Sequence, residues 1–501
     1  MIFRINTLSL LCSIFASTSV HAFENLNSNK NYGQARAYVG GNVLNPHTDI
    51  VVSNATILVD NGKITKIQPH SEKVPSNYEV TSLDNKWVIP GLIDGHVHLS
   101  QSGSAFTRPD TINAVKIETY QADQQWLLDN LSSLLGDYLS LGITTIFDMG
   151  GPSEYIEHYK STTQTGFYPD IYAAGSLLSP MPVPQLDHNG KIFTQVTNAE
   201  QAIAQVQNQL SFNTNIVKIV WSQETGMTAE QLMQMYQPAI AVAKKHNKTV
   251  AVHVEGLENA KQSIKAGADI LVHGVFTNEI DEEIIELMKA NDVTYMPTLS
   301  AYDHYMEIFS NQLTFSEHEK RHSHSKVMDS FSKLMANIND TDQMFKIFLT
   351  YIPKVDSSEQ ELAAMPAQDQ SIIKQLRTMF SSDIQNHQMV NLRKVIASGV
   401  NVAFGTDAGN PGTLHASSVF GEMKAWQQAG ISNKDILKAA TFANANALNL
   451  SDRVGELSSG KFANFVVLAQ NPYEQLETLK TPIMTVKGGQ TAFSAQEENN
   501  E

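Results

Sequence analysis

Eight short apolar segments, each followed by a longer stretch with helical patterning, constrain the fold of this chain more than any other feature. They lie at residues 88–98, 143–150, 170–178, 216–221, 249–255, 270–274, 294–300 and 401–407. Near-continuous apolar runs are typical of parallel strands that helices cover on both faces. Eight of them with helical crossovers predict an α/β fold of the (β/α)8 TIM barrel type, and the alternative is a doubly wound open sheet. Thr228 with Gln231, and Ser432 with Asp435, have the three-residue spacing of a capping box at a helix start. These two pairs support two of the predicted helices.

Both ends of the chain depart from this pattern. Residues 23–86 and 454–501 contain short strand-like runs separated by Gly, Asn, Asp and Pro, which is typical of brief antiparallel strands joined by turns. We expect the two ends to build one small β-sandwich domain together. The barrel then comprises residues 87–453.

The interval between the seventh and eighth segments is much longer than a strand-to-helix unit requires. From about residue 301 to 385 it is mostly helical in pattern and rich in Met, Phe and His. In a barrel this insertion follows a strand end on the face where active sites lie, so it can form a lid over the pocket. A packing insertion or an oligomer contact explains the pattern equally well, and the sequence leaves these alternatives open.

Residues 1–22 are expected to direct export rather than to fold. They contain Arg4, an apolar run over residues 8–16 and small residues before a cleavage point after Ala22, which is typical of a secretory signal peptide. The mature protein is therefore expected to be periplasmic or secreted. The run is shorter than the ~20 residues that cross a bilayer, and no other stretch is long enough, so we expect no membrane span after cleavage. Cys12, the chain's one cysteine, lies in this segment, so a metal would need His, carboxylate or Lys ligands.

The charge balance excludes one class of partner. The chain has 35 Lys plus Arg and 51 Asp plus Glu, a formal net charge of −16, which opposes attraction to phosphate backbones. We expect a small-molecule substrate and no nucleic acid partner. The oligomeric state stays open, a homo-oligomer included.

Histidines and one aspartate stand at the ends of the predicted strands. His96 and His98 are two residues apart, so both point to the same face of the first strand. His253, His273 and Asp407 each finish another strand. A buried histidine is usually a hydrogen-bonded core residue and a buried aspartate often caps a helix. Four histidines and an aspartate at strand ends on one face are better explained by a metal site.

Lys218 interrupts the fourth strand, where it shares a face with Ile216 and Val220. An inward lysine loses several kcal/mol of solvation unless its pKa falls or its charge is compensated. A neutral lysine amine beside a metal can react with carbon dioxide to give a carbamate, an anionic ligand able to bridge two ions. A salt bridge with Asp407 or a side chain that reaches solvent is the alternative.

Six features of the sequence, taken in order, resemble the amidohydrolase superfamily. They are VIPGLIDGHVHLS, Lys218, VAVHVEG, ADILVHG, GTDAG and GELSSGKFANFVVLAQNP. The resemblance spans about residues 36–490 and is closest to the branch of imidazolonepropionase-like amidohydrolases and metal-dependent Xaa-Pro dipeptidases. It implies a barrel with a β-sandwich from both termini and two divalent ions, expected to be zinc. One ion would be held by His96, His98 and Asp407, the second by His253 and His273, with carboxylated Lys218 between them. Asn464 stands where the family usually has Asp.

The expected chemistry is hydrolysis of a small-molecule amide. Two divalent ions that share a water lower its pKa to near neutrality, and Asp407 would act as general base and pass the proton to the leaving amine. An Xaa-Pro-type dipeptide or an N-acyl amino acid is the leading substrate class. The alternatives are a mononuclear cyclic-amide hydrolase of imidazolonepropionase type, a lactone or ester hydrolase, and a scaffold that has lost catalysis.

Two further residues are candidates for substrate binding. Arg108 follows the first strand and can bind a carboxylate through two hydrogen bonds, although a surface charge is the simpler interpretation. His415 follows the eighth strand and either supports the metal or substrate or makes a hydrogen bond that stabilises its loop. Ala403 and Gly405 share the inward face with Asp407 and leave room for a ligand.

Overall fold

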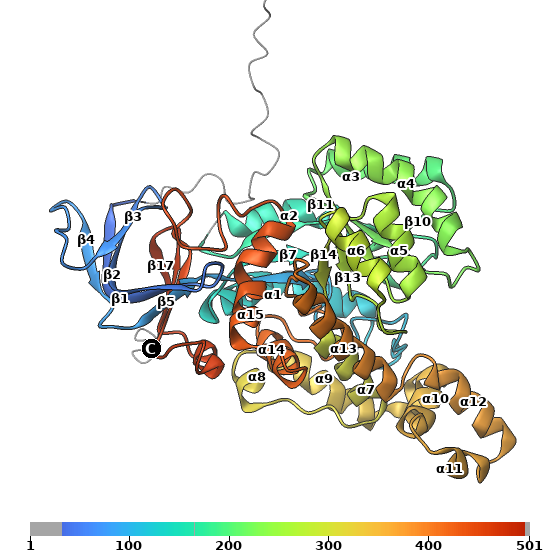
Figure 1. Ribbon diagram of the computed structural model, residues 1–501. Coiled ribbons are helices and arrows are strands. Elements are labelled where there is room, and N and C mark those ends of the chain that lie inside the picture. Colours follow the sequence, from blue (N-terminus) through green and yellow to red (C-terminus); the bar gives the residue numbers. More distant parts are fainter. Residues whose placement is uncertain (1–32, 165, 496–501) are drawn as a thin grey trace, which may run out of the picture.

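The computed structural model describes residues 33–164 and 166–495. A mixed β-sheet lies at one end of the molecule, and an α/β body with parallel strands forms the rest (Figure 1). The predicted signal peptide and Cys12 lie outside the described residues. Within those residues, no helix combines the length and apolarity that crossing a bilayer requires.

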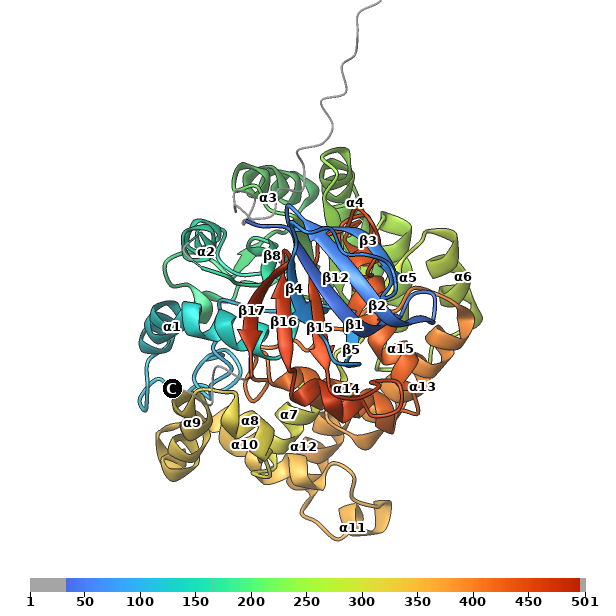
Figure 2. The ribbon, with the colours of Figure 1, turned by 90° about the vertical axis from the view of Figure 1, so that its left-hand side faces the viewer.

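Both ends of the chain contribute to one eight-stranded sheet (Figure 2). Its order is β17-β16-β15-β5-β1-β2-β3, and β4 pairs with β1. The pairing is mixed rather than antiparallel throughout, because β1 runs parallel to both β4 and β5. The strands are β1 (Arg36–Asn45), β2 (Ile50–Asp60), β3 (Lys63–Pro69), β4 (Glu79–Ser82), β5 (Trp87–Pro90), β15 (Phe465–Leu468), β16 (Met484–Lys487) and β17 (Gln490–Ser494).

The terminal sheet extends past its predicted end at residue 86. β5 pairs with β1 on one side and with β15 on the other, so it joins the two chain ends. Gly91 then separates β5 from the first strand of the α/β body, and its amide donates to the carbonyl of Asn464. Lys487 of β16 and Asp170 of the body form a buried ion pair at 2.5 Å, which fixes the sheet against the body.

The α/β body contains two parallel sheets, ordered β6-β7-β8 and β10-β9-β11-β12-β13-β14. Helices lie between most successive strands in the chain, as the alternating pattern predicts. The exception is the predicted strand over residues 170–178, which is split into β8 and β9 with no helix between them, and the two belong to different sheets. The strands are β6 (Leu92–Val97), β7 (Ile143–Asp148), β8 (Asp170–Ala173), β9 (Leu177–Ser179), β10 (Phe193–Gln195), β11 (Ile216–Val220), β12 (Thr249–His253), β13 (Ile270–Val272) and β14 (Thr294–Met296). The helices are α1 (Tyr120–Ser140), α2 (Tyr155–Thr163), α3 (Ala199–Ser211), α4 (Ala229–Lys245), α5 (Leu257–Ala266), α6 (Glu282–Ala290), α13 (Ser382–Ser398), α14 (Ser418–Gln428), α15 (Asn433–Lys438) and α16 (Asn444–Ala447).

Helix starts behave as their sequence patterns predict. Thr228 and Gln231 form a reciprocal capping box at the start of α4. The Ser432 side chain accepts from the amide of Asp435 at the start of α15. Both caps satisfy amides that a first helical turn leaves without a partner.

Isolated parallel bridges join the two sheets and residues 402–408. The bridges pair Ala174 with Ile216, Tyr295 with Val402, and Val97 with Ala408. One apolar cluster has members from β6, β7, β8, β11, β12, β13, β14 and residue 403, so these strands share an inward face. Its members from these elements are Ile93, Phe147, Tyr172, Ile216, Ala251, Ile270, Val272, Met296 and Ala403.

Residues 402–408 form bridges rather than the regular eighth strand that the sequence predicts. The Phe404 amide donates to the Asn444 side chain at 3.1 Å, and the Thr406 amide donates to Asp94 at 3.1 Å. Side chains therefore replace part of the backbone ladder. The seventh strand is also shorter than predicted, because β14 ends at Met296 and Leu299 begins a helix.

The insertion is helical, as its pattern predicts, and packs on the loop after β6. Phe106 and Ile112 from that loop share an apolar cluster with Phe309, Phe331 and Phe345 of the insertion. Its outermost helices project away from the terminal sheet (Figure 1). The helices are α7 (Leu299–Phe309), α8 (Glu317–Arg321), α9 (Ser325–Ala336), α10 (Gln343–Tyr351), α11 (Glu359–Ala363) and α12 (Ala367–Arg377).

Asp137 in the last turn of α1 provides a test of the packing between this helix and its neighbours. Burial raises the pKa of Asp137 to about 7. Because the folded state then binds a proton more tightly than the unfolded chain, this group lowers the free energy of unfolding as pH rises from about 4 to about 7. Above pH ~7 we expect Asp137→Asn to melt at a higher temperature than wild type. The expected gain in unfolding free energy is roughly 1–2 kcal/mol, after allowance for the partial solvent access of Asp137. Near pH ~4, where Asp137 is protonated in both states, we expect the variant and wild type to melt at the same temperature.

Thermal melts across that pH window measure the difference. Asp129→Asn, at an exposed position of the same helix, is the control and is expected to melt like wild type. A difference between Asp137→Asn and wild type that stays constant with pH contradicts the expectation.

Candidate metal centre

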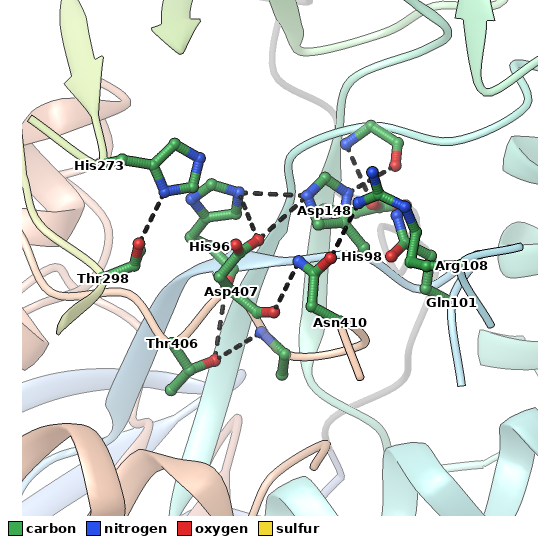
Figure 3. Close-up of polar contacts among 12 residues, drawn as sticks. His96, His98, Gln101, Arg108, Asp148, His273, Thr298, Thr406, Asp407 and Asn410 are labelled. Carbon is green, nitrogen blue, oxygen red and sulfur yellow. Dashed lines mark hydrogen bonds and ion pairs between the residues drawn. The ribbon is translucent and has the colours of Figure 1, made fainter. Parts of the chain in front are cut away.

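Three side chains converge where β6 ends and residues 402–408 return to it. Nε2 of His96 and Nε2 of His98 lie 3.1 and 3.2 Å from Oδ1 of Asp407, and 3.2 Å from each other. Figure 3 shows the three groups turned toward one another. The alternation of side chains along the first strand predicts that His96 and His98 share a face, and the structure places them so.

The donor atoms of this triangle fit a divalent cation. Nδ1 of His98 contacts the carbonyl oxygen of Gly150 at 2.9 Å, and because a carbonyl only accepts, Nδ1 carries the hydrogen. In the neutral ring the Nε2 lone pair then faces a carboxylate oxygen and a second imidazole. A tetrahedral ion with ligands at about 2.0–2.1 Å separates its ligand atoms by about 3.3 Å, close to the observed edges. His96, His98 and Asp407 can therefore hold a metal ion.

Burial and nearby charges set the protonation states that His96 and Asp407 need as metal ligands. Burial lowers the pKa of His96 well below its ordinary value, and the Lys218 ammonium lowers it further, which keeps the imidazole neutral as a ligand must be. Burial alone would raise the pKa of Asp407, but the surrounding imidazoles of His96, His98 and His273 lower it below its usual range. The carboxylate thus stays ionised. Asp407 also adopts a φ of 62°, in the left-handed region.

His273 and His253 extend the cluster on the side of His96 away from His98. The His273 ring centroid lies 5.1 Å from that of His96 and 4.6 Å from that of His253. Nδ1 of His273 contacts Oγ1 of Thr298 at 2.7 Å (Figure 3), and its φ of 65° is also left-handed. Nε2 of His253 lies 3.1 Å from Glu255, which leaves Nδ1 of His253 for another partner.

Lys218 points inward, as the alternation predicts. It pairs in register with Ala251 of β12, and Ile216 on the same face belongs to the inward apolar cluster. Its side chain is buried, and burial lowers the pKa of the amine to about 8 although Asp407 opposes the shift. Among the described residues, Asp407 makes its ion-pair contacts with His96 and His98 rather than with Lys218. A buried amine with a lowered pKa has a substantial neutral, nucleophilic fraction.

Arg108 and His415 lie close to the triangle but are engaged within the chain. Arg108 forms two hydrogen bonds with Asp110 at 2.8 and 2.7 Å, so that edge of the guanidinium is occupied. It is not a surface charge either, because it is partly buried and also donates to Asn410. His415 donates from Nε2 to the carbonyl of Gln101 at 2.7 Å and accepts from Tyr138 at Nδ1. Burial lowers the pKa of His415 to about 4, so this ring fits the loop-stabilising role that the sequence left open.

The sequence interpretation missed the residues that hold the candidate ligands. Thr298 contacts His273, and Asn410 donates to the backbone of Asp407. Asp94 accepts from Thr406 and from the amide of His96, which ties β6 to residues 402–408. Asp94 precedes His96 by two residues, so the same alternation could have identified it. Asn410 and Thr298 follow strand ends in loops, where no period predicts the direction of a side chain.

Gly405 sets the distance between residues 402–408 and β6. A Cβ at this position would lie 2.6 Å from Cβ and 3.0 Å from the backbone nitrogen of His96. Backbone atoms cannot yield cheaply, so we expect Gly405→Ala to displace His96, to lower the free energy of unfolding by roughly 2–3 kcal/mol and to weaken metal retention. Chemical denaturation and metal content measure the two effects.

Gly421→Ala is the matched control for this substitution. A Cβ at Gly421, within α14, meets nothing within 4 Å, so alanine there is expected to be neutral or to stabilise by up to about 1 kcal/mol. Equal behaviour of the two variants would contradict the contact with His96.

The model of the amidohydrolase family matches residues 87–492. An imidazolonepropionase from Pseudoalteromonas atlantica is 27% identical over 19% of this chain, and the match spans only 27% of that relative. A solved Xaa-Pro dipeptidase with bound methionine has a TM-score of 0.66 at 20% identity, over 91% of this chain and 99% of that one. An A. niger ochratoxinase has a TM-score of 0.65 at 17% identity, over 92% and 96%. At these identities the structural likeness shows the fold alone.

Proposed function

Because the chain belongs to the amidohydrolase family, a family of hydrolytic enzymes acting on carbon–nitrogen bonds, we propose that it is a metal-dependent hydrolase of small-molecule amides. The observation that carries this proposal is the triangle of His96, His98 and Asp407, in which the two Nε2 atoms and Oδ1 face one another at 3.1–3.2 Å. A divalent cation at the centre would accept a lone pair from each of these three atoms. The leading substrate class is an Xaa-Pro-type dipeptide or an N-acyl amino acid.

The proposed centre holds two divalent ions, with zinc as the leading choice. His96, His98 and Asp407 would bind one ion, and His253 and His273 the other. Lys218 would bridge them after its amine adds to carbon dioxide and loses a proton, which gives a carbamate. The lowered pKa of the Lys218 amine supports this step, since only a neutral amine attacks carbon dioxide. When bound, such ions polarise a carbonyl and lower the pKa of a water molecule.

The chain's own residues would then handle the proton and the orientation of the ligands. The Asp407 carboxylate accepts the proton of the attacking water and returns it to the nitrogen of the leaving amine, so the C–N bond breaks without a free amide anion. The Gly150 carbonyl holds His98, and Thr298 holds His273, each through Nδ1. These contacts fix which ring nitrogen faces the centre.

We also propose that the parallel strands form a (β/α)8 barrel. The three isolated bridges support this, because they link β8 to β11, β14 to residue 402, and residue 408 back to β6. The shared inward cluster gives independent support. In such a barrel the four candidate histidines and Asp407 stand at the carboxyl ends of strands, which is where active sites of this architecture lie, while Lys218 lies within β11.

A mononuclear cyclic-amide hydrolase is the second candidate. The match to imidazolonepropionase favours it, and in that case His96, His98 and Asp407 would form the metal site while Lys218 is structural. The buried, inward position of Lys218 and its lowered pKa support the first candidate. Metal content separates them, because the first requires two equivalents per chain and the second one.

The proposal is tested by screening the purified, metal-loaded protein against a library of dipeptides and N-acyl amino acids, with lactones and phosphoesters included. Cleavage confined to proline-terminated dipeptides supports the leading substrate class. Cleavage of cyclic amides alone supports the second candidate. Inertness toward every amide together with turnover of lactones or phosphoesters overturns the proposal.

Export remains part of the proposal on the strength of residues 1–22 alone. The leader pattern favours a periplasmic or secreted enzyme. N-terminal sequencing of the protein from its native host is expected to begin at Phe23. A mature chain that still begins at Met1 would contradict it.

A further inference from the structure

Asp407 has a backbone conformation that most residues with a Cβ avoid. Its φ of 62° lies in the left-handed region, where the Cβ crowds the following carbonyl oxygen. Such a conformation persists only where the surrounding contacts determine it. The amide of Asp407 donates to the carbonyl of His96 at 2.8 Å. On its other side, the carbonyl of Asp407 accepts from Nδ2 of Asn410 at 3.2 Å.

The orientation of the Asn410 side chain is fixed by two donors. Nη1 of Arg108 donates to Oδ1 of Asn410 at 3.0 Å, and the hydroxyl of Tyr305 donates to the same oxygen at 3.1 Å. A guanidinium has no acceptor, so the amide cannot rotate to present its NH2 group to Arg108. Nδ2 of Asn410 must therefore face Asp407. Asn410 is only 4% exposed, which leaves little access for water to take over these bonds.

The two donors come from separate parts of the chain. Arg108 lies in the loop after β6 and is itself fixed by its paired hydrogen bonds to Asp110. Tyr305 lies in α7, the first helix of the insertion. Figure 3 shows Arg108, Asn410 and Asp407 in sequence beside His98. The loop and the insertion thus meet at one amide, and that amide contacts the backbone of Asp407.

We propose that Asn410 is a positioning residue, which holds Asp407 in its left-handed conformation and keeps Oδ1 of Asp407 against the two imidazole nitrogens. This inference rests on the proposed function, in which Asp407 is a metal ligand and proton acceptor. It also gives the insertion a specific link to the centre, through the hydroxyl of Tyr305. Arg108 serves this link rather than a substrate carboxylate.

The substitution Asn410→Asp tests the role. An aspartate keeps an acceptor for Arg108 and Tyr305, but its side chain cannot donate to the carbonyl of Asp407, which then keeps only the 3.4 Å hydrogen bond from the backbone amide of residue 410. We expect a chelator to remove metal from this variant about 10-fold or more faster than from wild type. For the amide substrate found in the screen, we expect kcat to fall about 10- to 100-fold and KM to stay within about threefold. If this variant melts well below wild type, Asn410→Ser removes the amide without adding a charge and replaces it.

Thr413→Val is the matched control. His304 of α7 contacts Oγ1 of Thr413 at 3.0 Å, so this variant removes another hydrogen bond between the same helix and the same loop. The side-chain bonds of Asn410 and the backbone bond from the Thr413 amide to the Asn410 carbonyl stay in place. Thr413→Val is expected to release metal at the wild-type rate. Tyr305→Phe removes one of the two donors to Asn410, and its rate of metal release is expected to lie between those of wild type and Asn410→Asp. Equal acceleration in Thr413→Val and Asn410→Asp, or unchanged release in Asn410→Asp, overturns the inference alone. A wild-type protein that binds no metal overturns the proposed function as well.

Discussion

Asp407→Asn is expected to lower kcat/KM for amide hydrolysis by about 10⁴-fold or more while the protein still folds. The substitution removes the proton acceptor, which alone is worth about 10²–10⁴-fold, and it weakens one metal ligand. Asparagine has the same shape and tolerates the left-handed region at least as well as aspartate, so the φ of 62° is not disturbed. The loss therefore reports on the carboxylate and not on the backbone.

Steady-state kinetics and thermal melts of the metal-loaded variant give the measurement. Asp60→Asn, at an exposed position at the end of β2, serves as the control and is expected to match wild type in both. If Asp407→Asn keeps more than about a tenth of the wild-type kcat/KM, Asp407 is not the general base. If it fails to fold, its contacts matter for stability more than the geometry indicates.

Lys218→Met is expected to abolish most activity and yet to leave the metal-free protein as stable as wild type or more stable. The lysine is buried among apolar side chains, and replacing a buried charged group by an apolar side chain of similar volume is often neutral or stabilising by about 1–4 kcal/mol. Without the carbamate the centre loses its bridging ligand. We expect metal content to fall from two equivalents to one or fewer, and activity to fall about 10³-fold or more.

Lys248→Met is the control for this experiment. Lys248 is also buried, and burial also lowers its pKa, but it directly precedes β12, whose candidate ligand His253 stands at the opposite end. Its substitution is expected to leave metal content and activity unchanged. Reconstitution of wild type with and without bicarbonate completes the test. One metal equivalent in wild type, with full activity in Lys218→Met, would establish the mononuclear alternative.

Local rules in the sequence predict where the side chains of the candidate ligands lie. His96 and His98 share a face by the alternation of a strand, and Lys218 points inward by the same rule. His253 and His273 follow from the position of each strand end. Parallel strands bring their carboxyl ends to one edge, so residues far apart in the chain meet there without further information.

The parts that sequence analysis could not predict depend on contacts between segments. Residues 402–408 have the alternation of a strand, but the backbone amides of Phe404 and Thr406 donate to the side chains of Asn444 and Asp94 instead of to a neighbouring strand. No local sequence pattern indicates those partners. By its sequence position Arg108 is a candidate substrate ligand or a surface charge, whereas in the structure Asp110 and Asn410 hold it inside the chain. The direction of a loop side chain follows from backbone angles such as the left-handed φ of Asp407, which tertiary contacts impose.

The terminal sheet has a consequence for the order in which the molecule assembles. β5 is made well before its neighbour β15, which begins at Phe465, so one edge of the nascent sheet remains open until β15 has left the ribosome. Exposed strand edges invite pairing with other chains, and contacts between residues so distant in sequence form slowly. Pairing of β5 with β15 is thus the last step in closing the sheet. A premature stop or a delay in translation before this step would leave an unpaired strand edge, able to pair with other chains, on an otherwise folded body.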